Sequence, residues 1–391
     1  AALSVAADTA YVAERLPFTE FDFVRNGQAI RFNVADSARF TCDIVAYTCA
    51  AKEKATAPAK DEILSPDGRW AAFSRNENLW VRAVATGQET QLSTDGEAYW
   101  GYGVVPEGCC QEITNRRAKR KVWPVLRWSP DSKRIATHRY DERRVEPLNL
   151  IETVSGGRPK LHSYRYALPG DSVVPTWQPY VFDVEARRGT KIDIAPVPGF
   201  FTSADSSFRD VQWTQDGSSL FVTARSRDFK KYQLFQVDPA SGTARLVFTD
   251  SGQTYRELNQ FSGAPNWRVL KNGKEVLWWS ERDGWGHLYR VDATTGRVIA
   301  QVTSGPWLVL DLLAVDETLG TVHFTGVGRE RGVDPYYRML YQVGLDGSGF
   351  TRLSAENADH QVWATPSGRH FVDLYSRRDA APVGVVRAPD G

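Results

Sequence analysis

The sequence has few cysteines, almost no methionine and no long apolar run. Among 391 residues there are four cysteines and one methionine, and no segment approaches the roughly 18 apolar residues of a transmembrane helix. Lysine and arginine total 48 against 47 acidic residues, so the net charge of +1 gives no basic excess for binding nucleic acid or an anionic membrane. With 42% hydrophobic and 24% charged residues, the composition also excludes disordered and collagen-like chains.

Short motifs that carry catalytic or binding chemistry are missing as well. The sequence has no G-x-S-x-G nucleophile elbow, Walker loop, Rossmann fingerprint, H-E-x-x-H zinc motif or EF-hand loop. A paired-carboxylate hydrolase needs only two acids that meet in space, and no pair among the 47 acids stands out. We therefore expect no catalytic residue, no metal site and no cofactor on this chain.

The four cysteines are too few for a disulfide scaffold in a chain of this size. Cys42 and Cys49 are seven positions apart, a spacing that places them on facing strands of a hairpin. A Cys42–Cys49 disulfide would imply an oxidising compartment, and the alternative is two buried thiols. For the adjacent Cys109 and Cys110 we expect unmodified thiols rather than a disulfide between neighbours.

The residues that are abundant point to strands. Thirteen tryptophans, fifteen tyrosines and eighteen phenylalanines favour a pleated sheet, where aromatic side chains pack well. One sequence pattern, called the phrase below, also recurs. It consists of a turn with Asp or Asn and Gly, then alternating apolar residues, a polar gap and a second apolar pair. The phrase begins most clearly at Ser65, Ser129, Thr214 and Lys271, with weaker copies at Asn26, Asp316 and Pro366.

Each copy of this phrase predicts one small antiparallel sheet. The Asp-Gly or Asn-Gly pair supplies the positive φ of a tight turn, and the alternation in segments such as EVLWWS buries one face of a strand. A unit of about four short strands cannot bury its own face and must stack on its neighbours. The series therefore predicts an all-β fold, a β-propeller with four-stranded antiparallel blades. A β-sandwich with chance turn motifs is the alternative.

The number of blades follows from the spacing of the copies. Seven starts are visible, and the long gap between Asp131 and Asp216 has room for a degenerate copy around residues 162–194. We therefore expect seven or eight blades, with eight favoured. Little of the chain is typical of helix; the exception is Glu112 to Val122, which we interpret as a short helical insertion leaving a blade.

The later part of the chain resembles a known family. The segment ERDGWGHLY, followed by VTSGPWLV and RMLYQV, closely resembles the propeller of dipeptidyl peptidase IV-like serine peptidases in the prolyl oligopeptidase group. SPDGRWAAFSRNENLWV and LRWSPDSKRIATHRYDERRVEP are similar to the early blades of that family. The resemblance covers residues 20–386, and it implies that residues 1–391 are a single propeller domain.

The resemblance also implies what the chain does. In the family, an α/β-hydrolase domain that carries Ser, Asp and His follows the propeller, and the sequence stops at Gly391, where that domain would begin. The expected function is a noncatalytic propeller that gates access and helps bind the peptide amino terminus for a hydrolase running Ser-His-Asp acyl transfer. The expected partners are that hydrolase domain, a peptide substrate and a second copy in a homodimer. The expected location is periplasmic or secreted, with any targeting peptide either removed or left out of this sequence.

Candidate substrate-binding residues come from the same resemblance. The family binds the substrate ammonium with two adjacent glutamates on a helical insertion, because carboxylates accept charge-assisted hydrogen bonds. The corresponding stretch here contains Glu107 and Glu112 but no Glu-Glu pair, which puts dipeptidyl specificity in doubt. The alternative is that both are solvated acids beside a basic run, which itself would be a solvated face or a contact with the hydrolase domain.

A second candidate is the segment RYDERRV, which is similar to the Asp-Glu-Ser-x-Val segment of the family. Asp141 and Glu142 would replace the missing glutamate pair, although Arg143 stands where the family has Ser. The alternative is an ion-pair network that only shapes this loop.

Aromatic residues and a histidine of the later motifs are expected to be structural. We interpret His287 as a structural hydrogen-bonding residue, and Trp285, Tyr289 and Trp307 as core between blades.

Two functions compete with the propeller of a peptidase. One is a stand-alone propeller used as a protein-interaction module, and a glycan-active propeller ranks last. A surface that docks a hydrolase domain predicts an exposed apolar patch, whereas a stand-alone module should be polar on both faces.

Overall fold

The structure is a computed structural model of the chain. It describes residues 2–12, 15–18, 21–25, 27–34, 38–52, 61–106, 112–118, 124–154, 156–199, 208–256, 258, 265–365 and 367–391. These residues belong to two compact units, Ala1–Lys60 and Asp61–Gly391, and each unit is described by itself. The expectation of one domain over residues 1–391 stays a prediction.

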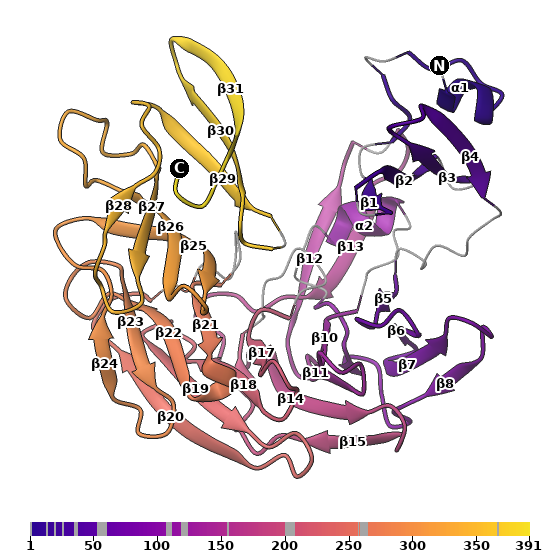
Figure 1. Ribbon diagram of the computed structural model, residues 1–391. Coiled ribbons are helices and arrows are strands. Elements are labelled where there is room, and N and C mark those ends of the chain that lie inside the picture. The colour runs from indigo at the N-terminus through magenta and orange to yellow at the C-terminus, as the bar shows by residue number, and fades with distance from the viewer. Residues whose placement is uncertain are drawn as a thin grey trace. The chain divides into compact units, whose positions relative to one another are not determined.

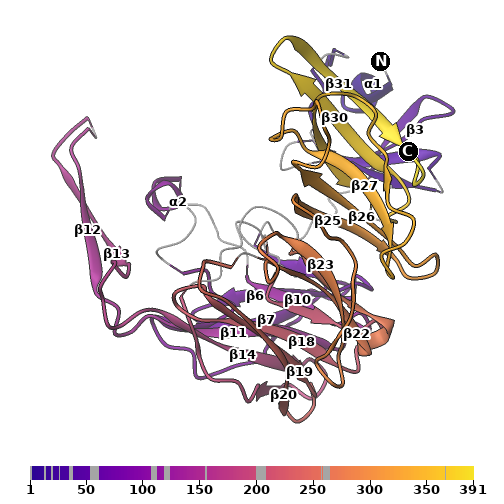
Figure 2. The ribbon, with the colours of Figure 1, turned by 90° about the vertical axis from the view of Figure 1, so that its left-hand side faces the viewer.

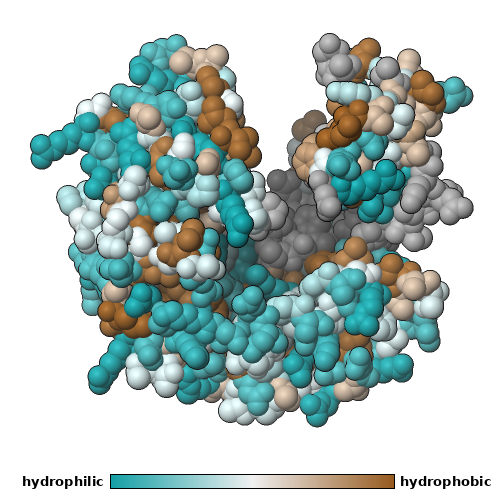
Figure 3. All heavy atoms as spheres, in the orientation of Figure 1, coloured by the Kyte–Doolittle hydropathy of each residue, from teal (hydrophilic) through white to brown (hydrophobic). Residues whose placement is uncertain are grey.

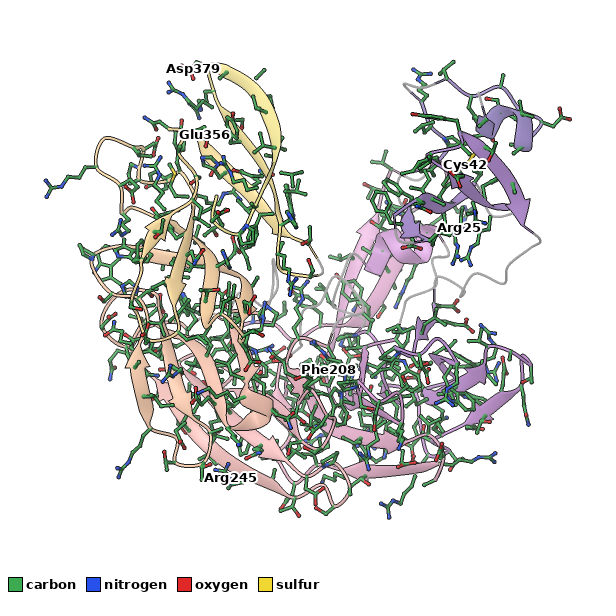
Figure 4. All side chains as sticks on the ribbon, viewed as in Figure 1. Arg25, Cys42, Phe208, Arg245, Glu356 and Asp379 are labelled. Carbon is green, nitrogen blue, oxygen red and sulfur yellow. A yellow bond between two sulfur atoms is a disulfide. The ribbon has the colours of Figure 1, made fainter. Side chains whose placement is uncertain are left out.

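The first unit is a short helix packed on one antiparallel sheet. Its elements are α1 (Ala2–Ala6), β1 (Asp22–Val24), β2 (Ala29–Val34), β3 (Ala38–Asp43) and β4 (Thr48–Lys52), and the strands pair in sequence order. The core joins Leu3 of the helix to Phe32, Phe40 and Cys42 of the sheet. Cys42 lies opposite Cys49 in the β3–β4 hairpin, and a disulfide joins the two residues (Figure 4).

The second unit is a series of six antiparallel sheets and one hairpin. The first two sheets are β5 (Ile63–Leu64), β6 (Trp70–Arg75), β7 (Asn78–Ala83) and β8 (Glu89–Gln91), and then β9 (Trp100–Tyr102), β10 (Leu126–Trp128), β11 (Arg134–Asp141), β14 (Thr176–Asp183), β15 (Arg188–Lys191) and β16 (Val197–Pro198). The hairpin is β12 (Pro147–Glu152) with β13 (Lys160–Arg165), and the helix is α2 (Glu112–Ala118).

The four later sheets follow the same meander. They are β17 (Val211–Trp213), β18 (Leu220–Arg225), β19 (Lys231–Val237) and β20 (Ala244–Ser251); β21 (Trp267–Leu270), β22 (Glu275–Ser280), β23 (His287–Asp292) and β24 (Val298–Gln301), with the 3₁₀ turn η1 (Lys271–Gly273); β25 (Leu308–Asp316), β26 (Thr321–Val327), β27 (Met339–Gly344) and β28 (Thr351–Arg352); and β29 (Asp359–Ala364), β30 (Phe371–Arg377) and β31 (Ala380–Arg387). Each sheet contacts the next in chain order, and Figures 1 and 2 show the six sheets following an arc.

These sheets confirm the all-β propeller, but they correct the number of blades. One blade sheet in the first unit and six in the second give seven among the described residues, whereas eight were favoured. The expected extra copy at residues 162–194 does not form a sheet of its own. Strand β13 instead pairs with β12 in the hairpin. Strand β14 pairs with β11 along eight residues and with β15, so both belong to the sheet of β10 and β11.

The repeated turn is a closed hydrogen-bonding unit. Ser65 Oγ donates to Asp67 Oδ1 at 2.7 Å, and Ser65 Oγ accepts from the Trp70 amide at 3.0 Å. The same arrangement recurs where Thr214 Oγ1 donates to Asp216 Oδ1 at 2.8 Å. Hydrogen bonds from Ser65, followed by the Arg69 amide, hold the pKa of Asp67 well below its usual range. Local chemistry therefore explains why this turn begins blade after blade.

The motif GWGHLY with TSGPW holds one blade together. The buried His287 donates from Nε2 to the Gly305 carbonyl at 2.9 Å, and its Nδ1 lies 3.0 Å from Thr303 Oγ1. The Trp307 ring contacts His287 edge-on at 5.0 Å and, like Tyr289, is buried in the core. The interpretation of Trp285 as core is wrong: this side chain is 45% exposed, because it follows Gly284 (φ 97°) in the β22–β23 turn.

Candidate functional site

The second candidate segment lies where β11 ends against β9. The register pairs Arg139 with Tyr102 and Asp141 with Trp100. The chain continues from Asp141 through Glu142 and Arg143 into the β12–β13 hairpin. Strand β9 and the loop that precedes it therefore lie next to the segment RYDERRV.

Two guanidinium groups pack on one tryptophan at this edge. The Cζ atom of Arg139 lies 3.2 Å from the ring centroid of Trp100, and that of Arg143 lies 3.7 Å from it. Such contacts are favourable because the ring face carries negative charge density. Arg139 is buried and its Nη1 donates to Asp95 Oδ2 at 2.8 Å, so the ring and the acid together hold this arginine in place.

Asp141 is engaged by Arg143. Arg143 Nε donates to Oδ1 at 3.0 Å and Nη2 donates to Oδ2 at 2.7 Å, which is a bidentate pair. Burial raises the pKa of Asp141, but hydrogen bonds from the Arg143 side chain and amide outweigh it and leave that pKa below its usual value. An ammonium group at Asp141 would therefore have to compete with Arg143, as the ion-pair alternative implies.

Glu142 has different surroundings from Asp141. It is 5% exposed, and its backbone amide donates to the Tyr99 carbonyl at 2.8 Å. Burial first, and then the charge of Glu142, raise the pKa of Tyr140 far above its usual value, while Arg225 acts in the opposite direction. Glu142 is thus buried near Tyr140, whereas Asp141 is paired with Arg143. The two adjacent acids therefore do not act as equivalent carboxylates.

The helical insertion is present, and the last four residues of the expected helix, 119–122, lie outside the described residues. Helix α2 covers residues 112–118, whereas Glu107, Cys109, Cys110 and the side chain of Glu112 lie outside the described residues. Arg116 Nη1 donates to the Ser163 carbonyl at 2.8 Å, and Arg117 Nη2 lies 2.9 Å from Glu152 Oε2. Part of the basic run therefore binds the β12–β13 hairpin.

A recess beside β9 is a feature that the sequence patterns did not reveal. Its cavity is about 260 Å³. It is lined by Ser74, Arg75, Asn76, Glu77, Gly103, Val104, Val105 and Pro124. Ser74 Oγ donates to the Tyr102 carbonyl at 2.9 Å, and the buried His138 donates from Nε2 to the Val104 carbonyl at 3.0 Å. These bonds fix the two walls of the recess.

Glu77 is held in an unusual conformation at this recess. It follows Asn76 in the two-residue turn between β6 and β7, and both residues have positive φ, 63° for Glu77 and 50° for Asn76. Glycine usually takes such positions, and strained residues cluster at functional sites. A Cβ atom on Gly101 would lie 2.2 Å from Glu77 Oε2, and one on Gly96 would lie 2.2 Å from the Glu77 carbonyl oxygen. Two glycines around β9 thus leave the space that Glu77 occupies.

Comparison with known proteins identifies the family. The model of the dipeptidyl peptidase IV (DPP IV) N-terminal region matches residues 33–382. The chain belongs to the dipeptidyl peptidase IV N-terminal region family. The resemblance inferred from the segments ERDGWGHLY and VTSGPWLV is therefore confirmed.

Relatives of this DPP IV N-terminal region are peptidases by name. Dipeptidyl-aminopeptidase B of Aspergillus niger is 26% identical over 314 residues, which are 75% of this chain and 33% of that protein. A probable dipeptidyl-aminopeptidase B of Aspergillus clavatus is 25% identical over 77% of this chain and 34% of its own length. The chain therefore spans about a third of the length of these relatives.

Solved structures show the same fold. Dipeptidyl peptidase 4 of Porphyromonas gingivalis superposes with a TM-score of 0.70 at 20% identity, over 95% of this chain and 51% of that one. A putative dipeptidyl aminopeptidase IV of Bacteroides ovatus gives a TM-score of 0.67 at 17% identity, over 92% and 49%. In the part of this chain that the structure describes, no helix has the length and apolar composition of a membrane span.

Proposed function

We propose that this chain is the noncatalytic propeller of a dipeptidyl peptidase IV-like serine exopeptidase. Membership of the DPP IV N-terminal region family carries this proposal, together with relatives more than twice as long that are named dipeptidyl-aminopeptidases. The Ser-Asp-His triad would lie on an α/β-hydrolase domain of the same polypeptide, which is the first partner proposed. The propeller would limit access to that domain and hold the amino terminus of a peptide.

The acids around β9 support amino-terminal binding. A carboxylate suits this task because it accepts charge-assisted hydrogen bonds from an ammonium group. Arg143 engages Asp141, and Glu142 is buried beside Tyr140. Glu77 lines the recess beside β9 in a turn with positive φ. We propose it as the acid that the ammonium contacts there, with Glu142 adding negative charge and the Asp141–Arg143 pair positioning Trp100. Glu107 and Glu112 stay predictions.

An apolar row on the last sheet supports docking to another surface. Trp363 is 53% exposed and Val386 is 70% exposed, and the register places both opposite Val372. Figure 3 shows apolar side chains gathered over β29–β31. A face of this kind is typical of an interaction site. This exposed apolar face favours a propeller that docks to a second domain. A stand-alone propeller would be expected to have two polar faces.

The length of the natural polypeptide tests this proposal. We expect immunoprecipitation followed by mass spectrometry to find a chain at least about twice as long as this one, since this chain covers 51% of a solved relative. Its tryptic peptides should include a G-x-S-x-G sequence, the motif of a nucleophile elbow. A natural polypeptide of 391 residues would instead favour the alternative, a stand-alone propeller that acts as a protein-interaction module.

The disulfide supports a location outside the cytoplasm. Disulfides such as Cys42–Cys49 persist mainly in oxidising compartments. We therefore propose a periplasmic or secreted protein.

The hairpin β12–β13 carries the proposed homodimer contact. Figure 2 shows it extending away from the sheets, and it exposes Ile151 by 67% and Leu161 by 66%. If the natural polypeptide is a dimer, the double substitution Ile151→Lys with Leu161→Lys should release monomers in light scattering after size exclusion. Leu319→Lys, at a site 71% exposed in the β25–β26 turn, is the control that should leave the dimer intact. A dimer that survives the double substitution would contradict this contact.

A further inference from the structure

Two arginines on the inner wall of the second unit have no acidic partner among the residues that the structure describes. Arg127 is the middle residue of β10 and is exposed, although its neighbours Leu126 and Trp128 are buried. Arg268 belongs to β21 and is half-buried. Because β10 and β21 are inner strands of their sheets, next to the centre of the arc in Figure 1, both residues belong to the wall around that centre.

Gln212 connects the two arginines. Arg127 Nη1 donates to the carbonyl of Val211 at 3.3 Å, one residue before Gln212 on β17. The buried Gln212 side chain donates from Nε2 to the Trp267 carbonyl at 2.8 Å and accepts from the Val269 amide at 3.1 Å. Arg268 Nη1 donates to the same Trp267 carbonyl at 2.8 Å. Arg127 therefore bonds the residue before Gln212, and Arg268 shares an acceptor with the Gln212 side chain.

All acceptors of these guanidinium groups among the described residues are backbone carbonyls. Arg127 makes the one bond to Val211, and Arg268 bonds Pro265, Trp267 and Leu312 through Nη1 and Nη2. A guanidinium group has five N–H donors, so several donors of each arginine remain for a ligand. In these ranges neither group has a carboxylate that would balance its charge.

The electrostatics agree with this geometry. Although solvent reaches Arg127, the protein atoms around its guanidinium group partly desolvate it and lower its pKa. Desolvation and then the charge of Arg127 lower the pKa of Arg268 to about 10. Two cations thus act on each other at a place with few counter-charges, and an anion between them would remove the repulsion.

We propose that Arg127 and Arg268 bind an oxyanion, either a peptide carboxylate or phosphate, at the inner wall of the propeller. Guanidinium groups suit both because their planar N–H donors match two oxygens of one anion. The proposal is independent of amino-terminal binding, since it uses other strands and the opposite charge.

Titration calorimetry on the whole chain at low ionic strength tests the site with three probes. They are inorganic phosphate, N-acetyl-Ala-Ala-Ala with a free carboxylate, and the amide of the same peptide; the acetyl group removes any contribution from amino-terminal binding. We expect phosphate or the free carboxylate to bind and the amide not to bind. Binding of the carboxylate peptide assigns a peptide ligand, and binding of phosphate alone assigns free phosphate. No binding of either anion would overturn the proposal.

Substitutions then locate the bound anion. Arg127→Gln and Arg268→Gln should each weaken binding at least tenfold, while Arg127→Lys should retain part of it. The control is Arg245→Gln, because Arg245 also donates to backbone carbonyls, those of Ala293 and Thr294, but lies at the outer edge of β20 (Figure 4). Equal binding by parent and both glutamine variants would overturn the proposal.

A second measurement guards against misfolding of the variants. Each glutamine variant removes one of two repelling charges but also loses hydrogen bonds to backbone carbonyls, so its thermal midpoint without ligand serves to show that the variant is folded. The rise in midpoint on adding the bound anion should be present in the parent and in Arg245→Gln and absent from both glutamine variants. A rise that persists in both would contradict the site.

Discussion

Replacing Arg387 by methionine is expected to destabilise the second unit by about 3–5 kcal/mol, because it removes the guanidinium group that balances the charge of a buried acid. Arg387 on β31 donates from Nε to Asp373 Oδ2 at 2.6 Å and from Nη2 to Glu356 Oε2 at 2.7 Å. His360 of β29 lies 2.9 Å from the same Asp373 oxygen, and both residues are fully buried. One charge network therefore joins all three strands of the last sheet.

The free energy of unfolding in urea, followed by tryptophan fluorescence, measures this effect. The same strands provide a control in the pair of Arg377 and Asp379, which meet at 2.9 Å but are exposed to solvent (Figure 4 labels Asp379 and Glu356). Surface pairs contribute little because water and salt screen them, so Arg377→Met should leave the unfolding midpoint nearly unchanged. Equal losses in the two variants would show that the buried network has no special role.

The network also predicts loss of stability in acid. Burial raises the pKa of Asp373, but hydrogen bonds from His360 and Arg387 outweigh it, so that pKa lies below its usual value in the folded state. Stability from the ionised Asp373 is complete above the ordinary carboxyl pKa of about 3.9 and is lost as the pH falls through the lower, folded value. The difference between the parent and Asp373→Asn should stay constant near neutral pH and shrink below about pH 4. A difference that grows in acid would contradict this assignment.

Local chemistry made most of the fold predictable, and long-range pairing made the rest unpredictable. The turn from Ser65 to Gly68 is specified by its own side chains, so a pattern within a few residues marks where a blade begins. The prediction of an eighth blade was wrong because the partner with which a strand pairs is not determined by nearby residues. Strand β14 pairs with β11 across the β12–β13 hairpin, and no residue type in residues 162–194 signals that choice.

The candidate site shows the same division. The segment RYDERRV was found because five charges at a strand end are visible in the sequence. Glu77 was missed because its proposed role depends on Gly96 and Gly101, which approach it from strand β9 and the loop before it. Glutamate is also not a residue typical of a turn with positive φ. The one local signal, N-E between two apolar strands, was too weak to separate from an ordinary turn.

Replacing Glu77 by glutamine should reduce amino-terminal recognition about 10–100-fold, the equivalent of one charge-assisted hydrogen bond of about 1.5–3 kcal/mol. The measurement is kcat/KM of the natural full-length polypeptide for tripeptide amides with a free amino terminus, against the same substrates after acetylation. The parent should prefer the free amino terminus, and Glu77→Gln should lose most of that preference with little change for the acetylated substrates. Glu97→Gln removes an exposed acid, 3.8 Å from Arg143, and is the matched control for a general change in charge.

A glycine at the same position separates recognition from strain. Glu77→Gly also removes the carboxylate, but glycine adopts a φ of 63° without strain, so we expect a gain in stability of about 1 kcal/mol together with the loss of recognition. Glu77→Gln should lose recognition without that gain. If instead Glu77→Gln keeps the preference and Glu142→Gln loses it, the ammonium group contacts Glu142, and the positive φ at Glu77 belongs to the turn alone. If the glycine variant gains stability and loses recognition, the protein retains a strained turn because the Glu77 carboxylate binds the substrate.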